Sequence, residues 1–346
     1  MIDSMPLLLT LAAAAAWGLT ALVRAYARRH LMDVPNSRSS HGLPTPRGGG
    51  LGVVLTWYSA LWLLPAAAAG GGGMAEACAA GVAVAAVGFV DDHGHLSPRL
   101  RIAVHVAAAG WALWWLGGMP SITLGGQAWH LGWAGSALAL VAIVWMLNLF
   151  NFMDGIDGIA GSEGVFVAGA GGILNFVWFP ESGQGLLNLV LAASCAGFLL
   201  WNWPPAAIFL GDVGSSFIGF ILGVAALASA ARGGASLAVW AILAAVFVAD
   251  ASFTLLRRMA SGQRWFEAHR SHAYQHAVLR LGGHRPVTLW VWAINLGWLL
   301  PLALLALRQP QAEPALLFLA YAPLLALVAA LGAGRTLPPV RSGAGS

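Results

Sequence analysis

Two aspartates three residues apart interrupt an apolar part of the chain. They are Asp154 and Asp157 in NLFNFMDGIDGIAG, residues 148–161, which also holds Asn148, Asn151 and three glycines. In a helix, residues i and i+3 share one face, so both carboxylates can meet one ligand. The glycines permit close backbone approach or a broken helix. Solvated acids at a helix end are the alternative, but those usually come singly and without such glycines. We expect a binding or catalytic loop.

Two further segments combine aspartates with glycines. GFVDDHGHLSPRLR, residues 88–101, places Asp91 and Asp92 side by side, and their side chains point about 100° apart in a helix. One carboxylate can therefore bind a metal while the other takes a proton or attacks, and helix-end solvation is the alternative. In IFLGDVGSS, residues 208–216, Asp212 lies between glycines before an apolar run. The helix dipole alone favours an acid there, but this tight backbone also suits a hard cation or a phosphate.

Basic residues gather in two other segments. His269, His272 and His276 stand at i, i+3 and i+7 with Arg280 at i+11, so a continuous helix places all four on one face. The spacing also allows a zinc site, but no cysteine is nearby and many acids lie opposite, so phosphate binding is favoured. The segment MDVPNSRSSHGLPTPRGGGLG, residues 32–52, is either a flexible basic loop or a glycine run whose amides approach an anion.

The elements that position these residues are predicted to be transmembrane helices. Of 346 residues, 59% are hydrophobic and 9% are charged, against about 25% charged in soluble domains. We expect an all-α polytopic membrane protein with one catalytic domain over residues 1–346. The first span is not a convincing signal peptide, because no positive region precedes it. The eleven predicted spans are 6–26, 48–66, 74–90, 102–118, 132–150, 160–179, 185–203, 214–231, 235–256, 286–307 and 314–333.

The arginines orient these spans. All 17 basic residues are arginine, and an external N-terminus places all but Arg232 and Arg308 on the cytoplasmic side, together with the C-terminus. The cytoplasmic loops are then predicted near 27–47, 91–101, 150–160, 203–214 and 257–285. Basic loops in a membrane protein report topology, so we expect no nucleic acid partner. Most of the acids gather on the same face, although a carboxylate near the membrane core costs about 2.5–3.5 kcal/mol at mid-depth.

Acids suited to Mg²⁺ beside cations suited to phosphate predict pyrophosphate chemistry at the membrane surface, with a phosphorylated lipid as one partner. The motifs HGLPTPRGGG, GFVDD, NLFNFMDGIDGIAG, IFLGDVGSS and AHRSHAYQHA follow one another between Asp33 and Arg285. In this order they resemble the polyprenyl-phosphate N-acetylhexosamine-1-phosphate transferases, a superfamily within glycosyltransferase family 4. It includes phospho-N-acetylmuramoyl-pentapeptide transferase and the enzymes that initiate O-antigen and teichoic acid synthesis.

The resemblance implies transfer of a sugar-1-phosphate from a UDP-N-acetylhexosamine to undecaprenyl phosphate, releasing UMP, with Mg²⁺ or alternatively Mn²⁺. It places the protein in the bacterial inner membrane and is compatible with a homodimer. Asp91 and Asp92 resemble the catalytic pair, one of which deprotonates the lipid phosphate or attacks the sugar nucleotide, and His272 is the best-matched catalytic histidine. The implied metal residues are Asp212, Asp92 and Asp157. The implied substrate-binding residues are Asn151, Asp154, Asp157, Asn202, Phe209 (stacking on uracil), Arg270, His269, His276 and Arg47.

The chain departs from the pattern at HAYQ, residues 272–275, where many members have a longer histidine run. This form resembles the branch that starts O-antigen or related glycans, often with N-acetylglucosamine (GlcNAc) or 6-deoxy N-acetyl sugars, and the peptidoglycan enzyme is the alternative. A CDP-alcohol phosphatidyltransferase is disfavoured because no arginine follows Ala160. A transporter is a third interpretation, but its charges should lie at mid-depth and on both faces.

Overall fold

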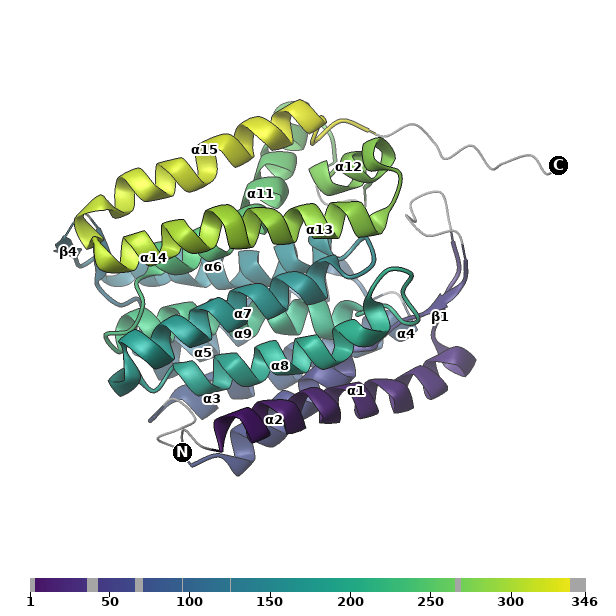
Figure 1. Cartoon of the computed structure of the whole chain (residues 1–346), viewed down its shortest axis with the longest axis horizontal. Helices are drawn as coiled ribbons and strands as arrows, with labels where there is room; N and C mark the ends of the chain where they lie inside the picture. Colours follow the sequence, from purple (N-terminus) through teal and green to yellow (C-terminus); the bar gives the residue numbers. More distant parts are fainter. Residues whose placement is uncertain are drawn as a thin grey trace.

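Helices make up nearly all of the regular structure in the computed structural model, and most of them run roughly parallel or antiparallel in one bundle (Figure 1). The structure describes residues 4–35, 43–65, 71–94, 96–124, 126–264 and 269–336. Two short antiparallel hairpins lie at opposite ends of the bundle. One pairs β1 (Met32–Asp33) with β2 (Thr45–Pro46), and the other pairs β3 (Ile122–Leu124) with β4 (Gln127–Trp129).

The helices follow one another along the whole chain. In order they are α1 (Met5–His30), α2 (Gly50–Leu63), α3 (Met74–Ala79), α4 (Gly81–His93), α5 (Pro98–Leu116), α6 (Gly132–Met153), α7 (Ile159–Trp178), α8 (Gly185–Asn202), α9 (Asp212–Ala231), α10 (Leu237–Leu243), α11 (Ala245–Ala260), α12 (Ala273–Leu281), α13 (His284–Ile294), α14 (Leu300–Arg308) and α15 (Glu313–Leu331). Short 3-10 helices are η1 (Pro180–Ser182) and η3 (Pro310–Ala312), and a π-helix, η2 (Asn295–Leu299), joins α13 to α14.

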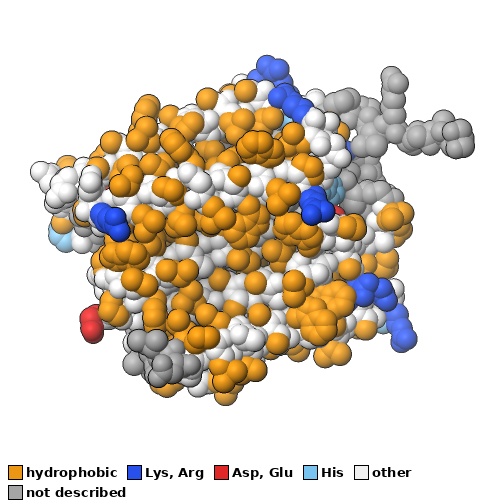
Figure 2. All heavy atoms as spheres, in the orientation of Figure 1, with side chains coloured by type: hydrophobic (Ala, Val, Ile, Leu, Met, Phe, Trp, Pro, Cys, Tyr) orange, Lys and Arg blue, Asp and Glu red, His pale blue; other side chains and the backbone are white. Residues whose placement is uncertain are grey.

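The prediction of an all-α polytopic membrane protein is confirmed. Each predicted span falls on a helix or a broken helix, and within the described ranges eight helices are long and apolar enough to cross a membrane. The number becomes nine if a bent pair counts as one span. The eleven-span count stays a prediction, because two of the predicted spans are not among these helices. The helix α2 has only 14 residues, about 21 Å at 1.5 Å per residue, and α5, on the predicted span 102–118, does not qualify either. Figure 2 shows apolar side chains over most of one face, with arginines near its edges.

One predicted span is not continuous. Residues 235–256 form α10 and α11, whose axes differ by 78° at Ala244. The sequence has no glycine or proline at this break, and these are the usual local signs of a kink. As Figure 1 shows, α11 leaves the common helix direction and approaches α12. The bend therefore brings the end of α11 to the histidine segment.

The central helix is α9, with 89% of its span buried. It packs against α2, α4 and α6, and small residues let these helices approach closely. A Cβ added at Gly50 would lie 2.3 Å from the Cα of Gly214, far inside van der Waals contact. Because α9 starts at Asp212, this tight packing fixes the position of one predicted metal residue.

Candidate active site

Asp92 caps the start of α9. Its Oδ1 accepts a hydrogen bond from the backbone N–H of Asp212 at 3.0 Å, and its Oδ2 accepts from Val213 at 3.2 Å. A carboxylate at a helix N-terminus satisfies free N–H groups and the helix dipole. Glycine allows this approach, since a Cβ at Gly88 would lie 2.5 Å from the carbonyl oxygen of Asp212. Both oxygens of Asp92 are thus engaged in holding α4 to α9, and its metal and catalytic roles stay predictions.

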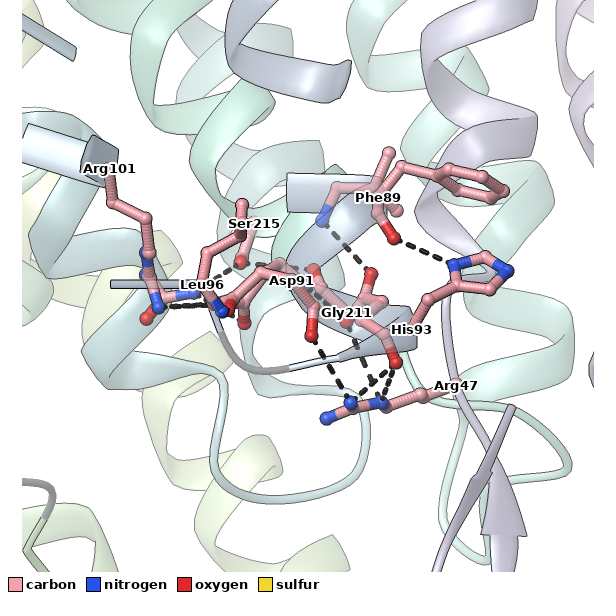
Figure 3. Close-up of polar contacts among 12 residues, drawn as sticks. Arg47, Phe89, Asp91, His93, Leu96, Arg101, Gly211 and Ser215 are labelled. Carbon is pink, nitrogen blue, oxygen red and sulfur yellow. Dashed lines mark hydrogen bonds and ion pairs between the residues drawn. The ribbon is translucent and has the colours of Figure 1, made fainter. Parts of the chain in front are cut away.

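Asp91 points the other way and meets Asp212. The Arg101 Nη1 donates to Asp91 Oδ2 at 2.5 Å and lies 3.1 Å from Asp212 Oδ2, so two carboxylates from different helices converge on one cation. The second oxygen of Asp91 accepts the backbone N–H of Leu96 at 2.8 Å, which ties the following loop to α4. Figure 3 shows Asp91, Leu96 and Arg101 together, with Arg47 on the opposite side of the group.

The 148–161 segment joins this group at the end of α6. Asn151 Nδ2 donates to Asp212 Oδ1 at 2.7 Å and to Ser215 Oγ at 3.2 Å. Asp154 follows as the C-cap of α6, and its side chain has no hydrogen-bond partner among the described residues. Burial, and then the charges of Asp212, Asp92 and Asp157, raise the pKa of Asp154 well above its usual range. The segment therefore adds an unpartnered carboxyl group to an already negative site.

These groups fit a magnesium ion that is completed by its substrate. In the part of the chain that the structure describes, no three His, Cys, Asp or Glu side chains form a ready-made metal cage. Mg²⁺ commonly takes one or two carboxylates and fills its other positions with water and substrate phosphates. Asp91 and Asp212 supply two hard oxygen ligands that already share a cation, and the Asn151 amide N–H₂ group holds Asp212 in place. A divalent ion would also relieve the repulsion that raises the pKa of Asp154.

Arg47 reaches the same group from β2. Its Nε donates to the backbone oxygen of Asp92 at 3.0 Å, and its Nη2 lies 3.4 Å from that of Asp91. It is thus a cation at the C-terminal end of α4, which is favourable for the helix dipole. The backbone of Phe209 pairs with this strand segment, donating to Pro46 O at 2.8 Å and accepting from Gly49 N at 2.9 Å. The half-buried Phe209 is therefore held beside Arg47, and its stacking on uracil stays a prediction.

Asp157 and Asn202 connect loops. Asp157 Oδ2 accepts from the backbone N–H of Ala206 at 3.0 Å, and Oδ1 lies 3.2 Å from His284 Nδ1. The Asn202 side chain accepts from Gly158 N and donates to Ile208 O, both at 2.9 Å. Together they clamp the loop after α6 to the loop before α9. Their predicted contacts with metal and uridine are untested, and both side chains have structural partners.

The four-residue basic face predicted for 269–280 is wrong. The helix α12 begins only at Ala273, so His269 and His272 precede it. His276 and Arg280 do lie on the helix, but they face the end of α15. His276 Nε2 is 3.1 Å from Arg335 O, and Arg280 Nη2 donates to Leu331 O at 3.1 Å. The contact of His276 with substrate stays a prediction, and this geometry places it at a helix junction.

His272 lies against the acidic loop instead. Its ring is 6.3 Å from that of Phe152 and 4.9 Å from that of His269, and it is 3% exposed. Its Nδ1 is 3.3 Å from a carboxylate oxygen of Asp250 on α11. Burial, and then the charges of His272 and Arg258, lower the pKa of His269 to about 3, so its imidazole is neutral near pH 7.

Tyr274 links the two halves of the site. Its hydroxyl donates to Phe152 O at 3.0 Å. A Cβ at Gly155 would lie 2.0 Å from that hydroxyl oxygen, so the absence of a side chain at Gly155 makes room for the tyrosine. Burial, followed by the charges of Asp250 and Asp154, raises the pKa of Tyr274 well above its usual range, so it stays a neutral donor. The predicted phosphate contact Arg270 is half-buried, and its Nε has no hydrogen-bond partner within the described ranges.

Contacts join all five predicted loops at one end of the bundle. Several of the residues that make these contacts do not stand out in the sequence. Arg101 counts in the sequence only as one of the arginines that orient the spans, although it closely follows the Asp91–Asp92 motif. His284 and Asp250 carry no motif signal, and Tyr274 stands out only as a replacement for histidine. Of these residues, only Asp250 carries a sign in the sequence, because an acid inside an apolar run is unusual.

Known proteins are similar to this chain over most of its length. The family model described as glycosyl transferase family 4 matches residues 74–230. A decaprenyl-phosphate N-acetylglucosaminephosphotransferase of Mycobacterium leprae is 30% identical over 81% of this chain and 81% of its own length. A Bacillus subtilis protein named a probable undecaprenyl-phosphate N-acetylglucosaminyl 1-phosphate transferase is 28% identical over 76% and 74%. A phospho-N-acetylmuramoyl-pentapeptide-transferase of Moorella thermoacetica is 30% identical over 61% and 69%. The chain therefore belongs to glycosyl transferase family 4.

Proposed function

We propose that this protein transfers an N-acetylhexosamine-1-phosphate from a UDP-sugar to undecaprenyl phosphate with Mg²⁺, releasing UMP, at the cytoplasmic face of a bacterial inner membrane. The observation that carries the proposal is the convergence of Asp91 and Asp212 on one cation, Arg101, at the end of an apolar bundle. A divalent ion with substrate phosphates is the natural ligand of such a group, and a lipid phosphate is the substrate that reaches it from the membrane.

The reaction exchanges one phosphorus–oxygen bond for another. An oxygen of undecaprenyl phosphate attacks the sugar-bound phosphorus of the UDP-sugar, the bond to the UMP oxygen breaks, and a lipid diphosphate sugar forms. Bound Mg²⁺ would neutralise charge on the phosphates that approach each other. Asp91 and Asp212 would hold it, with Asn151 positioning Asp212, while Arg47 and Arg270 offer positive charge to the phosphates. Asp92 keeps α9 in place.

A proton of the lipid phosphate needs an acceptor. Asp154 suits this task because its carboxyl group has no hydrogen-bond partner among the described residues and its pKa is raised by burial and by neighbouring carboxylates. A raised pKa makes this carboxylate a stronger base than an ordinary aspartate. We assign proton removal to Asp154, with Asp91 on the metal side of the reacting phosphates.

The relatives favour GlcNAc as the sugar. The Mycobacterium leprae and Bacillus subtilis relatives, which cover 81% and 76% of this chain, are named for N-acetylglucosamine, whereas the muramoyl-pentapeptide relative covers 61%. Initiation of O-antigen or a related surface glycan is the cellular role that we propose, because the HAYQ segment resembles that branch.

The test is a donor screen with purified protein in undecaprenyl phosphate micelles and Mg²⁺. UDP-GlcNAc, UDP-N-acetylgalactosamine, a 6-deoxy UDP-N-acetylhexosamine and UDP-N-acetylmuramoyl-pentapeptide are each supplied with a labelled sugar phosphate. We expect label in the lipid fraction and equimolar UMP with an N-acetylhexosamine donor. Transfer from the pentapeptide donor alone would replace this assignment with the peptidoglycan reaction, and no transfer from any donor would reject it.

A further inference from the structure

We propose that Asp250 is a positioning residue of the active site, which acts by holding His272 with a proton on Nδ1 and leaving Nε2 as the ring atom that meets substrate. The inference rests on the proposed function for its catalytic meaning. Its structural part concerns a buried carboxylate in the middle of a predicted span, which the reaction scheme above does not use. Asp250 lies on α11, beyond the 78° bend.

Asp250 is only 4% exposed, and its carboxylate accepts four hydrogen bonds. Its Oδ1 accepts from Thr254 Oγ1 at 3.0 Å, from the backbone N–H of Ala273 at 2.9 Å and from His272 Nδ1 at 3.3 Å. Its Oδ2 accepts from the backbone N–H of Tyr274 at 2.9 Å. It therefore caps the first turn of α12 from a neighbouring helix and touches the imidazole with the same oxygen.

This geometry determines which ring nitrogen of His272 carries the proton. An ionised carboxylate only accepts hydrogen bonds, so the nitrogen that faces Asp250 must be a donor. In the neutral ring Nε2 is then the acceptor that remains for another group. A carboxylate behind a histidine is the general way in which proteins select its tautomer and orientation.

The surroundings place that ring where it can act. Phe152, two residues before Asp154, stacks near the imidazole, and Tyr274, whose ring also stacks on it, donates to Phe152 O. Asp250 thus fixes the start of α12, and through it both the imidazole and the tyrosine that contacts the acidic loop. The bend at Ala244 is required, because a straight continuation of α10 would carry Asp250 away from the histidine segment.

A double-mutant cycle separates positioning from simple support of the fold. Asp250→Asn keeps the shape of the side chain but places an N–H₂ group against at least one of the groups that donate to the carboxylate. We expect it to lower kcat about 10- to 100-fold with little change in the KM for UDP-sugar. In a His272→Ala background the same change should lower kcat less than about 2-fold, because the group it positions is gone. Equal losses in both backgrounds would overturn the proposal.

Glu313→Gln is the matched control. Glu313 is also a buried carboxylate, 2% exposed, but it bonds Ser236 at the far end of the bundle. It should leave kcat within about 2-fold of wild type in both backgrounds. A loss at Glu313 equal to that at Asp250 would show that any buried acid affects turnover and would reject a specific role for Asp250.

A second measurement needs no enzymatic activity. In protein labelled with ¹⁵N-histidine and placed in lipid nanodiscs, the His272 signals are those that disappear in His272→Ala. We expect a protonated Nδ1 in the wild type and a changed or mixed tautomer in Asp250→Asn. A wild-type His272 protonated at Nε2 alone would overturn the inference. This test stands even if Asp250→Asn does not fold, and a wild type with the expected tautomer but no transfer would reject only the proposed function.

Discussion

Asp91 and Asp92 are neighbours in the chain but have different partners because the end of α4 turns their side chains apart. Asp92 faces the backbone of α9, whereas Asp91 faces Arg101 and Asp212. The acids and glycines of the motifs are readable from the sequence. The partners of Asp92 are not, because its hydrogen bonds join residues about 120 positions apart, as between Asp92 and Val213. Only the packing of α4 on α9 brings them together.

At this scale we expect Asp92→Asn to lower stability more than Asp91→Asn. An amide at position 92 would turn an N–H₂ group toward a backbone N–H at the start of α9, which should cost about 1–3 kcal/mol. Asp91 is at the edge of the group, so its amide variant should unfold within about 0.5 kcal/mol of wild type while losing activity. Thermal unfolding in detergent measures both, and equal destabilisation would contradict the assignment of Asp92 to helix capping.

Asp154 gives a prediction about pH. Its pKa is raised, so the carboxylate that accepts a proton forms only as the pH rises through that pKa, and the carboxyl group is protonated below it. The kcat for transfer should therefore fall on the acidic side. Asp154→Asn should lower kcat about 10²- to 10⁴-fold and remove this acidic limb. A pH–rate profile of both proteins at saturating Mg²⁺ is the measurement, and an unchanged limb in the variant would assign the titration to another group.

At the scale of the element, the sequence predicts where the long helices lie but not where every helix begins or bends. The apolar runs locate the long helices because their lengths and compositions are strong signals. The start of α12 is not predicted, since it depends on Asp250 from another helix capping Ala273 and Tyr274. The bend at Ala244 is not predicted either, because it too depends on packing between helices. Neither feature has a local proline or glycine to mark it.

The contact between α4 and α9 can be tested with a methyl group. Gly88→Ala adds a Cβ 2.5 Å from the carbonyl oxygen of Asp212, so the two helices must move apart. We expect a loss of about 1–3 kcal/mol in stability, together with lower activity, because Asp212 moves. Gly18→Ala is the control, since a Cβ at that position in α1 meets nothing within 4 Å. Its stability should be unchanged or higher, and equal behaviour of the two variants would contradict the close packing.

For the whole molecule, the polar residues that matter lie at one end of an apolar bundle. The arginines and acids of the sequence predict this gathering, since all arginines but Arg232 and Arg308 fall on one side in the predicted topology. They do not predict how the helices are arranged inside the bundle, with α9 at the centre and its N-terminus in contact with Asp92. The result is a cluster of acids and arginines at the end of a membrane-embedded scaffold, where we propose that the substrate phosphates bind.

Reporter fusions test the predicted orientation of this bundle. A fusion at Gly262, after α11, should place a fluorescent protein in the cytoplasm and leave alkaline phosphatase inactive. A fusion at Gly233, after α9, should do the reverse, because α10 and α11 lie between the two positions. The opposite pattern at both sites would invert the topology and move the site to the outer face, away from cytoplasmic UDP-sugars.

The most direct test of the central claim is exchange of labelled UMP into UDP-GlcNAc by the purified protein. The exchange requires the transfer of the sugar phosphate to run forward and in reverse at one site. We predict exchange that needs Mg²⁺ and undecaprenyl phosphate, that stops on chelation and returns when Mg²⁺ is restored, and that falls at least about 10³-fold in folded Asp212→Asn. Exchange that persists in Asp212→Asn, or that is absent from the wild type with every N-acetylhexosamine donor, would contradict the account.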